Sequence, residues 1–373
     1  MTASLPTPAR STAELAARSL EIILDGQAPS GAFIAGPTFG QYRYAWLRDG
    51  AFIAEALDLV GRTDAAARFH DWVASLMVAA SDGIKRSIAA AAAGGSPAPE
   101  DYLHCRYAAD GSLGPDDWPT FQLDGPGIWL WSLAEHARRG GTVTSAHRAA
   151  ADLAARYLTA LWDHPSYDAW EESPKHVHTS TVAGILVGLR AARELLGSDT
   201  PPEVGVAEAG IVERLAAHEG TYTKWDGNDA VDASLLWIAA PYGLQPPDAP
   251  AFAATLLRIE AELVSTAGGV TGGVYRYAAD TYYGGGEWLL LTACLGRVYL
   301  RRDGPGDRAR AERCRGWIEA QADSDGNLPE QVASHALHPE RVDEWVALWG
   351  PSASPLLWSH AAYLALVTEL ERR

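Results

Sequence analysis

Two adjacent glutamates beside a tryptophan, Trp170-Glu171-Glu172, are the residues whose types and spacing most directly suggest chemistry. Like charges repel and an indole ring excludes water, so both kinds of neighbour disfavour the ionised form of a carboxyl group. A carboxylic acid that stays protonated near neutral pH can act as a general acid. The alternative is a solvated pair at a helix end beside a core tryptophan, which is the commoner origin of so short a motif.

Four further segments combine aromatic residues with charged or amide side chains, and most of them directly precede a predicted helix. They are residues 42–50, 118–127, 276–288 and 327–332. The glycine run within the third segment lacks the Lys-Ser or Lys-Thr of a phosphate loop. In a ring of helix pairs, these loops would lie at one end. We therefore expect one bowl lined by Trp, Tyr, Arg, Asp and Glu, in which a polyhydroxyl ligand could bind.

Helical periodicity dominates the chain, and no run of alternating apolar and polar residues indicates a sizeable sheet. The pattern predicts an all-α fold in which helix pairs form two rings. The glycine- and proline-rich residues 94–99 are few enough to be a loop, so residues 1–373 are expected to form a single domain. The predicted helices are 12–25, 48–60, 63–80, 124–138, 146–163, 179–196, 202–218, 230–240, 250–265, 287–301, 306–321 and 359–371.

The composition excludes several classes of partner. With 30 Lys and Arg against 47 Asp and Glu, the formal net charge is -17, and such a surface repels nucleic-acid phosphates and anionic lipid. Cys105, Cys294 and Cys314 have no paired spacing, which favours a reducing compartment. No secretion signal or membrane-spanning run is evident, so a cytoplasmic location is expected. The 14 Trp and 14 Tyr against 6 Phe suit a sugar site, because pyranose faces stack on flat rings.

Taken in order from Tyr42 to His360, these motifs resemble the glucoamylase family, glycoside hydrolase family 15. The resemblance implies an (α/α)6 barrel, with six helical hairpins in two concentric rings, and an inverting, exo-acting α-glucosidase. It also implies that Glu171 is the general acid and that Glu172 binds sugar hydroxyls. Glu330, in a Leu-Pro-Glu-Gln motif, matches the general base that activates water on the other face of the sugar.

The same resemblance implies a set of substrate-binding residues. Arg48 and Asp49 match a pair that grips the non-reducing terminal sugar; the alternative is a structural ion pair at a helix start. Asp168, three residues before Glu171, could share a helical face with it and act as an auxiliary carboxylate. The other expected substrate-binding residues are Tyr42, Trp46, Trp118, Trp170, Glu172, Arg276 and Trp288.

The expected partner is a short neutral oligosaccharide. Residues 173–178 depart from the pattern of many members of the family that the chain resembles, so the leaving-group side of the pocket is expected to differ. No β-sandwich domain or starch-binding module is evident, which disfavours polymers. We predict release of β-glucose from α-1,6 disaccharides such as isomaltose, ahead of α-1,4 maltooligosaccharides or a trehalase-type substrate.

Two other functional classes are disfavoured. Sugar epimerases and unsaturated-glucuronide hydrolases use similar barrels, but they lack this pairing of a Trp-Glu-Glu motif with a late Pro-Glu-Gln motif. A non-enzymatic sugar-binding protein would be favoured only if Glu171 or Glu330 were replaced, and both are present.

No cofactor or metal is expected. Residues 323–327 have the wrong glycine spacing for a calcium loop and are interpreted as a turn. His176 and His178 are too close together to share a helix face, and no partner cluster is evident. Asp124 and Asp280 are expected to hold a helix start or a loop rather than substrate.

Overall fold

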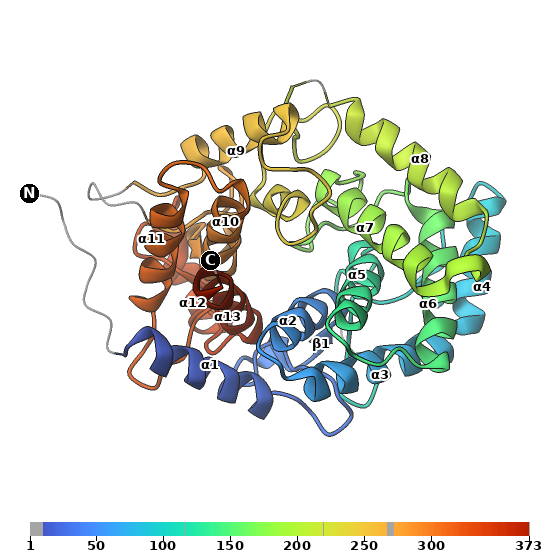
Figure 1. The fold of residues 1–373 in the computed structure, drawn as a ribbon, viewed down its shortest axis with the longest axis horizontal. Coiled ribbons are helices and arrows are strands. Elements are labelled where there is room, and N and C mark those ends of the chain that lie inside the picture. The colour runs from blue at the N-terminus through green and yellow to red at the C-terminus, as the bar shows by residue number, and fades with distance from the viewer. Residues whose placement is uncertain (1–9, 116, 219, 267–271, 373) are drawn as a thin grey trace, which may run out of the picture.

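Two concentric rings of helices form the molecule (Figure 1). The structure is a computed structural model, and it describes residues 10–115, 117–218, 220–266 and 272–372. The chain alternates between the rings, so the predicted (α/α)6 barrel is confirmed. The outer ring consists of α1 (Thr12–Asp25), α3 (Thr63–Ala79), α6 (Ser145–Leu161), α8 (Glu203–Ala216), α9 (Pro250–Glu262) and α11 (Asp307–Glu319). The inner ring consists of α2 (Leu47–Leu59), α5 (Asp124–Arg138), α7 (Thr179–Leu196), the 3-10 helix η3 (Ala233–Ile238), α10 (Leu289–Arg302) and α13 (Leu357–Glu371).

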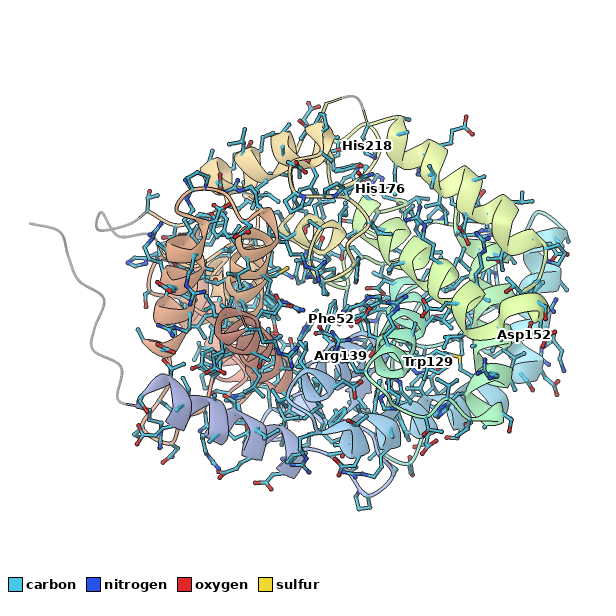
Figure 2. All side chains as sticks on the ribbon, in the orientation of Figure 1. Phe52, Trp129, Arg139, Asp152, His176 and His218 are labelled. Carbon is cyan, nitrogen blue, oxygen red and sulfur yellow. The ribbon has the colours of Figure 1, made fainter. Side chains whose placement is uncertain are left out.

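Burial distinguishes the two rings. Every residue of α2 is buried, and α7 and α10 are buried along most of their lengths, as expected for helices packed on all sides. The outer helices α1 and α6 bury one face only. Aromatic side chains pack against one another inside the inner ring: Phe52 of α2, labelled in Figure 2, stacks on Trp358 with ring centroids 5.0 Å apart and packs against Trp237.

Most helix positions follow the sequence prediction, and three differ. Helices α1, α5 and α7 have the predicted bounds. The prediction of a helix over 230–240 is wrong, because only the six residues of η3 are helical, between the capping side chain of Asp232 and Pro241. Helix α4 (Ser81–Ala92), which buries only Ile84 and Ser87, and helix α12 (Val342–Trp349), which buries no residue, were not predicted.

Short antiparallel strand pairs fix the loops at one end of the barrel. Strand β1 (Ala45–Trp46) pairs with β2 (Arg106–Tyr107), and β3 (Glu287–Trp288) pairs with β4 (Gln331–Val332). These two-stranded ladders are the only sheets among the described residues, as predicted. Strands β1 and β3 lead directly into α2 and α10, so the loops that carry the candidate site residues are tied to the starts of inner helices.

Two further features concern the molecule as a whole. In the described part of the chain, no helix combines the length and the apolar character needed to cross a bilayer. All three cysteines are buried with free thiols, consistent with the absence of paired spacing in the sequence.

Candidate active site

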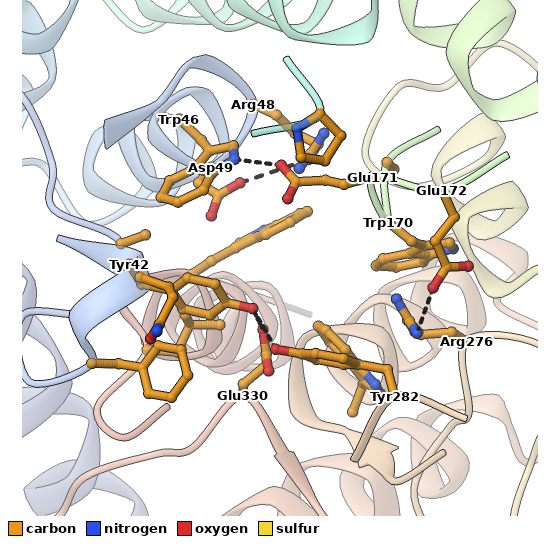
Figure 3. Close-up of a pocket in the computed structure, with 18 of the residues that line it drawn as sticks. Tyr42, Trp46, Arg48, Asp49, Trp170, Glu171, Glu172, Arg276, Tyr282 and Glu330 are labelled. Atoms are coloured by element: carbon orange, nitrogen blue, oxygen red, sulfur yellow. Dashed lines mark hydrogen bonds and ion pairs between the residues drawn. The ribbon is translucent and has the colours of Figure 1, made fainter. Parts of the chain in front are cut away.

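A pocket opens at the end of the barrel where the inner helices begin (Figure 3). All the predicted site residues line it except Asp168. Its empty volume is about 1070 Å³ including the open mouth, which is close to the upper limit of about 1,000 Å³ that is typical of small-molecule sites. The residues that line it are Ala35, Phe39, Gln41, Tyr42, Trp46, Arg48, Asp49, Trp118, Pro119, Ala169, Trp170, Glu171, Glu172, Arg276, Tyr282, Trp288, Glu330, Trp345, Trp349, Leu356 and Trp358.

A tight turn, not a helix, presents Glu171 to the pocket. Glu171 itself has a positive φ of 66°, which is unusual for a residue with a side chain. Asp168 holds the turn, because its Oδ1 accepts hydrogen bonds from the backbone N–H groups of Trp170 and Glu172, both at 2.9 Å. The expectation that Asp168 shares a helical face with Glu171 is therefore wrong: the carboxylate lies behind the turn and is 2% exposed.

Buried charges support this turn from behind. The Nζ of Lys224 lies 3.3 Å from a carboxylate oxygen of Asp168 and 3.3 Å from one of Asp232. Asp232 also accepts the indole N–H of Trp170 at 3.0 Å. One lysine thus compensates two buried carboxylates, and the network holds both the turn and the adjacent tryptophan in place.

One oxygen of Glu171 is fully engaged and the other is not. Its Oε1 accepts the indole N–H of Trp46 at 2.7 Å and the amide N–H of Gln122 at 3.0 Å, and the thiol of Cys105 lies 3.7 Å away. Among the described residues, no group donates to Oε2. Burial raises the pKa of Cys105 well above its usual value, so this group remains a thiol. Because these donors all meet Oε1, Oε2 is the oxygen that can carry a proton towards a substrate, which suits a general acid.

Glu330 lies across the pocket from Glu171 (Figure 3). Its Oε1 accepts a hydrogen bond from the hydroxyl of Tyr42 at 3.0 Å, and that hydroxyl also contacts the hydroxyl of Tyr282 at 2.8 Å. Its Oε2 is buried and has no partner among the described residues. Burial raises the pKa of Glu330 to about 7, against the Tyr42 hydrogen bond, which lowers it. A base whose pKa lies near neutral pH is well placed to take a proton from water.

The floor of the pocket carries a buried arginine among carboxylates. The Nη1 of Arg48 donates to Gln122 at 2.7 Å and to Asp124 at 3.1 Å, and its Nε lies 3.6 Å from Asp49. Burial raises the pKa of Asp49 to about 7; Arg48 opposes this, and the nearby Glu171 carboxylate adds to it. Asp124 lies in the first turn of α5, but no side chain caps this helix; the Asp124 carboxylate accepts from Arg48 instead, so the expectation that it holds the helix start is wrong.

One wall of the pocket is formed around Arg276. Its guanidinium donates from Nε to Asp280 at 2.7 Å and from Nη2 to Glu172 at 3.1 Å (Figure 3). Asp280 also accepts the backbone N–H of Tyr282 at 2.9 Å, so its predicted loop-holding role is confirmed. The hydroxyl of Tyr277 donates to the other oxygen of Glu172. Glu172 is thus held by two donors at the edge of the pocket.

The roles of some residues in and around the pocket were not predicted from the sequence. Gln122 and Tyr282 lie inside segments that were singled out, but nothing in their spacing showed that Gln122 contacts Glu171 or that Tyr282 contacts the hydroxyl of Tyr42. Trp345 and Trp349 belong to α12, which was not predicted, so no signal placed them near the pocket. Lys224 lies outside every segment that was singled out, and only the fold brings it to Asp168.

The motifs discounted from the sequence have local structural roles. Residues 323–327 form a turn in which the Asp323 carboxylate accepts the backbone N–H of Asn327 at 2.8 Å. His176 stacks on Trp225 with ring centroids 4.2 Å apart, and the Nε2 of His178 lies 3.0 Å from the carbonyl oxygen of Ser173. Both rings are therefore held by contacts within the protein.

A different group of side chains brings possible metal-ligand atoms together. Asp58, His70 and His136 place one such atom each within 4.8 Å of one another. Asp58 already contacts the Nδ1 of His136 at 3.0 Å. The group lies at the far ends of α2 and α5, away from the helix starts that form the pocket, so it does not belong to this site.

Comparisons with known proteins identify the family and the fold. The sequence profile of glycosyl hydrolases family 15 matches residues 12–368. The chain is 43% identical to the isomaltose glucohydrolase of Kribbella flavida over 96% of its length and 92% of the relative. Among solved structures, a glycosidase variant in complex with glucose has a TM-score of 0.89 at 42% identity, covering 96% of this chain and 97% of that one. The glucoamylase of Hormoconis resinae, with a TM-score of 0.71 at 17% identity over 97% of this chain and 73% of that one, shares the fold.

The chain therefore belongs to glycoside hydrolase family 15 and is a glycoside hydrolase.

Proposed function

We propose that this protein is an inverting, exo-acting α-glucosidase in which Glu171 is the general acid and Glu330 the general base. Glu171 gives its proton to the glycosidic oxygen as the bond from that oxygen to the anomeric carbon breaks. Glu330 takes a proton from a water molecule, whose oxygen forms the new bond on the opposite face of the ring. Glu171 ends ionised and Glu330 protonated, and exchange with solvent restores both.

The observation that carries this proposal is the state of the two carboxyl groups. Each has one oxygen held by protein donors and one oxygen without a partner among the described residues. The two groups face each other across the pocket (Figure 3). An acid and a base that must act on opposite faces of one sugar ring require this arrangement, with a separation of about 6.5–9.5 Å that leaves room for the water.

The closed floor supports exo action. Arg48, Asp49 and Trp358 are at most 8% exposed, so a sugar that reaches them can have no further residue beyond it. Buried polar atoms that lack a hydrogen-bond partner within the described residues include Oδ1 of Asp49 and the indole nitrogens of Trp118 and Trp288. Hydroxyl groups of a terminal glucose would satisfy such atoms, which are costly to leave unpaired. We assign substrate binding to these residues together with Tyr42, Trp46, Trp170, Glu172 and Arg276, and a positioning role to Asp168.

The proposed substrates are short α-glucosides, with α-1,6-linked isomaltose preferred. The 43% identity to an isomaltose glucohydrolase supports this linkage. The pocket, whose empty volume of about 1070 Å³ includes the open mouth, has room for such a short substrate. The alternatives are α-1,4-linked maltooligosaccharides and trehalose, which would place the second ring differently against the same two glutamates.

Proton NMR of fresh reaction mixtures tests the reaction, and a substrate panel tests the linkage. We expect β-glucose as the first product, whereas initial α-glucose would contradict inversion. We expect the highest kcat/KM for isomaltose among isomaltose, maltose and trehalose. A kcat/KM that climbs steadily from maltose through maltoheptaose to soluble starch, and exceeds that for isomaltose, would refute the preference for short α-1,6 substrates.

A further inference from the structure

Helix α12 leaves large apolar side chains at the surface beside the pocket. It lies between the strand that follows Glu330 and the last inner helix, and none of its residues is buried. Val346 is 40% exposed, Leu348 64% and Trp349 46%. Trp345 and Trp349 both line the pocket. Exposed apolar side chains that adjoin a pocket indicate contact with a ligand more often than chance placement does.

An unusual backbone segment holds the region around α12 in place. Tyr283, Gly284 and Gly285 have consecutive positive φ angles of 47°, 76° and 70°. The carbonyl oxygens of Gly284 and Gly285 accept the backbone N–H groups of His338 at 2.7 Å and Leu337 at 3.0 Å. A Cβ on Gly284 would lie 2.7 Å from the carbonyl oxygen of His338, so only glycine permits this close approach.

Aromatic contacts complete the attachment. The ring of Trp345 stacks on Tyr283 with centroids 5.7 Å apart and meets Tyr282 edge-on at 4.9 Å. The hydroxyl of Tyr283 donates to the carbonyl oxygen of Gly350, just beyond the helix, at 2.8 Å. The glycine run that does not fit a phosphate loop therefore serves to anchor α12 over the mouth of the pocket.

The difference in burial between the floor residues and Trp349 indicates which part of a substrate α12 would contact. Arg48 on the floor is 5% exposed and Trp358 is 6% exposed, whereas Trp349 is 46% exposed. Because the terminal glucose occupies the floor, the group that leaves must lie towards the mouth. Trp118 and Pro119, which are partly buried, line the same pocket.

We propose that α12 forms the leaving-group site, in which Trp349 and Trp345 stack against a second sugar ring or an aromatic aglycone. The chemical class is a neutral leaving group with a flat apolar face, because Asp343 and Glu344 on the same helix would repel a phosphorylated one. This inference rests on the proposed α-glucosidase activity and adds that α12, not the barrel floor, discriminates between leaving groups.

The test compares substrates that share the glucose but differ in what leaves. Isomaltose and p-nitrophenyl α-glucoside present a ring to α12, whereas the fluoride of α-glucosyl fluoride is too small to reach it. We expect Trp349→Ala to lower kcat/KM for the first two substrates about ten-fold, which corresponds to about 1.4 kcal/mol, in the range of aromatic stacking. The value for α-glucosyl fluoride should change less than about two-fold.

Leu348→Ala is the matched control, because Leu348 is a neighbouring exposed residue of α12 that does not line the pocket. It should leave all three substrates unchanged. An equal loss on all three substrates with Trp349→Ala, or no loss on any, would overturn the inference. If the unmodified enzyme fails to hydrolyse α-glucosyl fluoride at all, the proposed α-glucosidase function fails instead, so the two failures are distinguishable.

Discussion

The floor and the mouth of the pocket differ in how deeply their residues are buried and in how they are attached to the barrel. The floor lies at the starts of inner helices, where Arg48, Gln122 and Asp124 are buried and hydrogen-bonded to one another. The mouth is lined in part by α12, a helix without a buried residue that is attached through Trp345 and a glycine turn. A buried floor whose side chains are held by hydrogen bonds cannot adapt to a different ring, whereas an exposed wall can be exchanged without exposing the core.

The floor and the mouth should therefore control different properties of the enzyme. Reaction type and recognition of the terminal glucose depend on the floor and on the two glutamates above it. The preference for a leaving group depends on the mouth. Substitutions should therefore divide into those that affect every substrate and those that affect only substrates with a large leaving group.

The largest effects should come from the two glutamates, and they should differ in kind. Glu330→Gln removes the base, so we expect kcat to fall by about 10²–10⁴-fold on every substrate. Glu171→Gln should cause a similar loss on isomaltose but a much smaller one on α-glucosyl fluoride, because fluoride leaves without a proton. Steady-state kinetics with both substrates measures this. If Glu330→Gln leaves hydrolysis of α-glucosyl fluoride nearly unchanged and Glu171→Gln does not, the roles of the two glutamates are reversed.

The next largest effect should come from Lys224, which supports the turn that carries Glu171 without lining the pocket. Lys224→Met leaves Asp168 and Asp232 buried without their cation, so the free energy of unfolding should fall by about 3–5 kcal/mol. Lys85→Met is the control, because its ion pair with Asp82 is exposed and is worth about 0–1 kcal/mol. Urea unfolding measures both. Equal changes in the two variants would mean that the buried network contributes no more than a surface pair.

An intermediate effect concerns pH. Glu330 must be ionised to act as a base, and burial raises its pKa to about 7, so kcat/KM should rise with pH through that value. Tyr42→Phe removes a donor that stabilises the ionised carboxylate, so the acid limb should move to higher pH. Tyr102→Phe, which loses a hydrogen bond to Thr120 elsewhere, should leave the limb in place. A limb that does not move with Tyr42→Phe would show that another group governs it.

The fold was predictable because inner and outer helices leave a clear trace in the sequence. Amphipathic or fully apolar periodicity and cap residues defined α1, α5 and α7 at their observed bounds. Helix α12 could not be found this way, because it is short and packs on a glycine turn rather than on a core. Its location is determined by contacts between residues distant in sequence.

Only the site residues that belong to recognisable motifs could be predicted from the sequence. Glu171, Glu330 and the residues around them were identified through resemblance, and the pocket brings them together. Asp168 shows the limit: its spacing from Glu171 suggested a helical face, whereas its side chain holds a turn by accepting two backbone N–H groups. A three-residue spacing fits both conformations, and only the surrounding network with Lys224 decides between them.

The smallest expected effect would separate the mouth from the floor by changing one backbone position. Gly284→Ala places a side chain in a left-handed conformation, which costs about 1–2 kcal/mol, and against the carbonyl oxygen of His338. Gly140→Ala, with a φ of 88° and open space around it, has the backbone cost alone and lies at the end of α5 away from the pocket. Gly284→Ala should lose more stability in urea than Gly140→Ala, because its Cβ also meets the carbonyl oxygen of His338. Only Gly284→Ala should lower kcat/KM for isomaltose, by about five-fold or roughly 1 kcal/mol, while hydrolysis of α-glucosyl fluoride stays within about two-fold. If Gly284→Ala slows both substrates equally, the attachment of α12 also supports the floor, and the two regions are not independent.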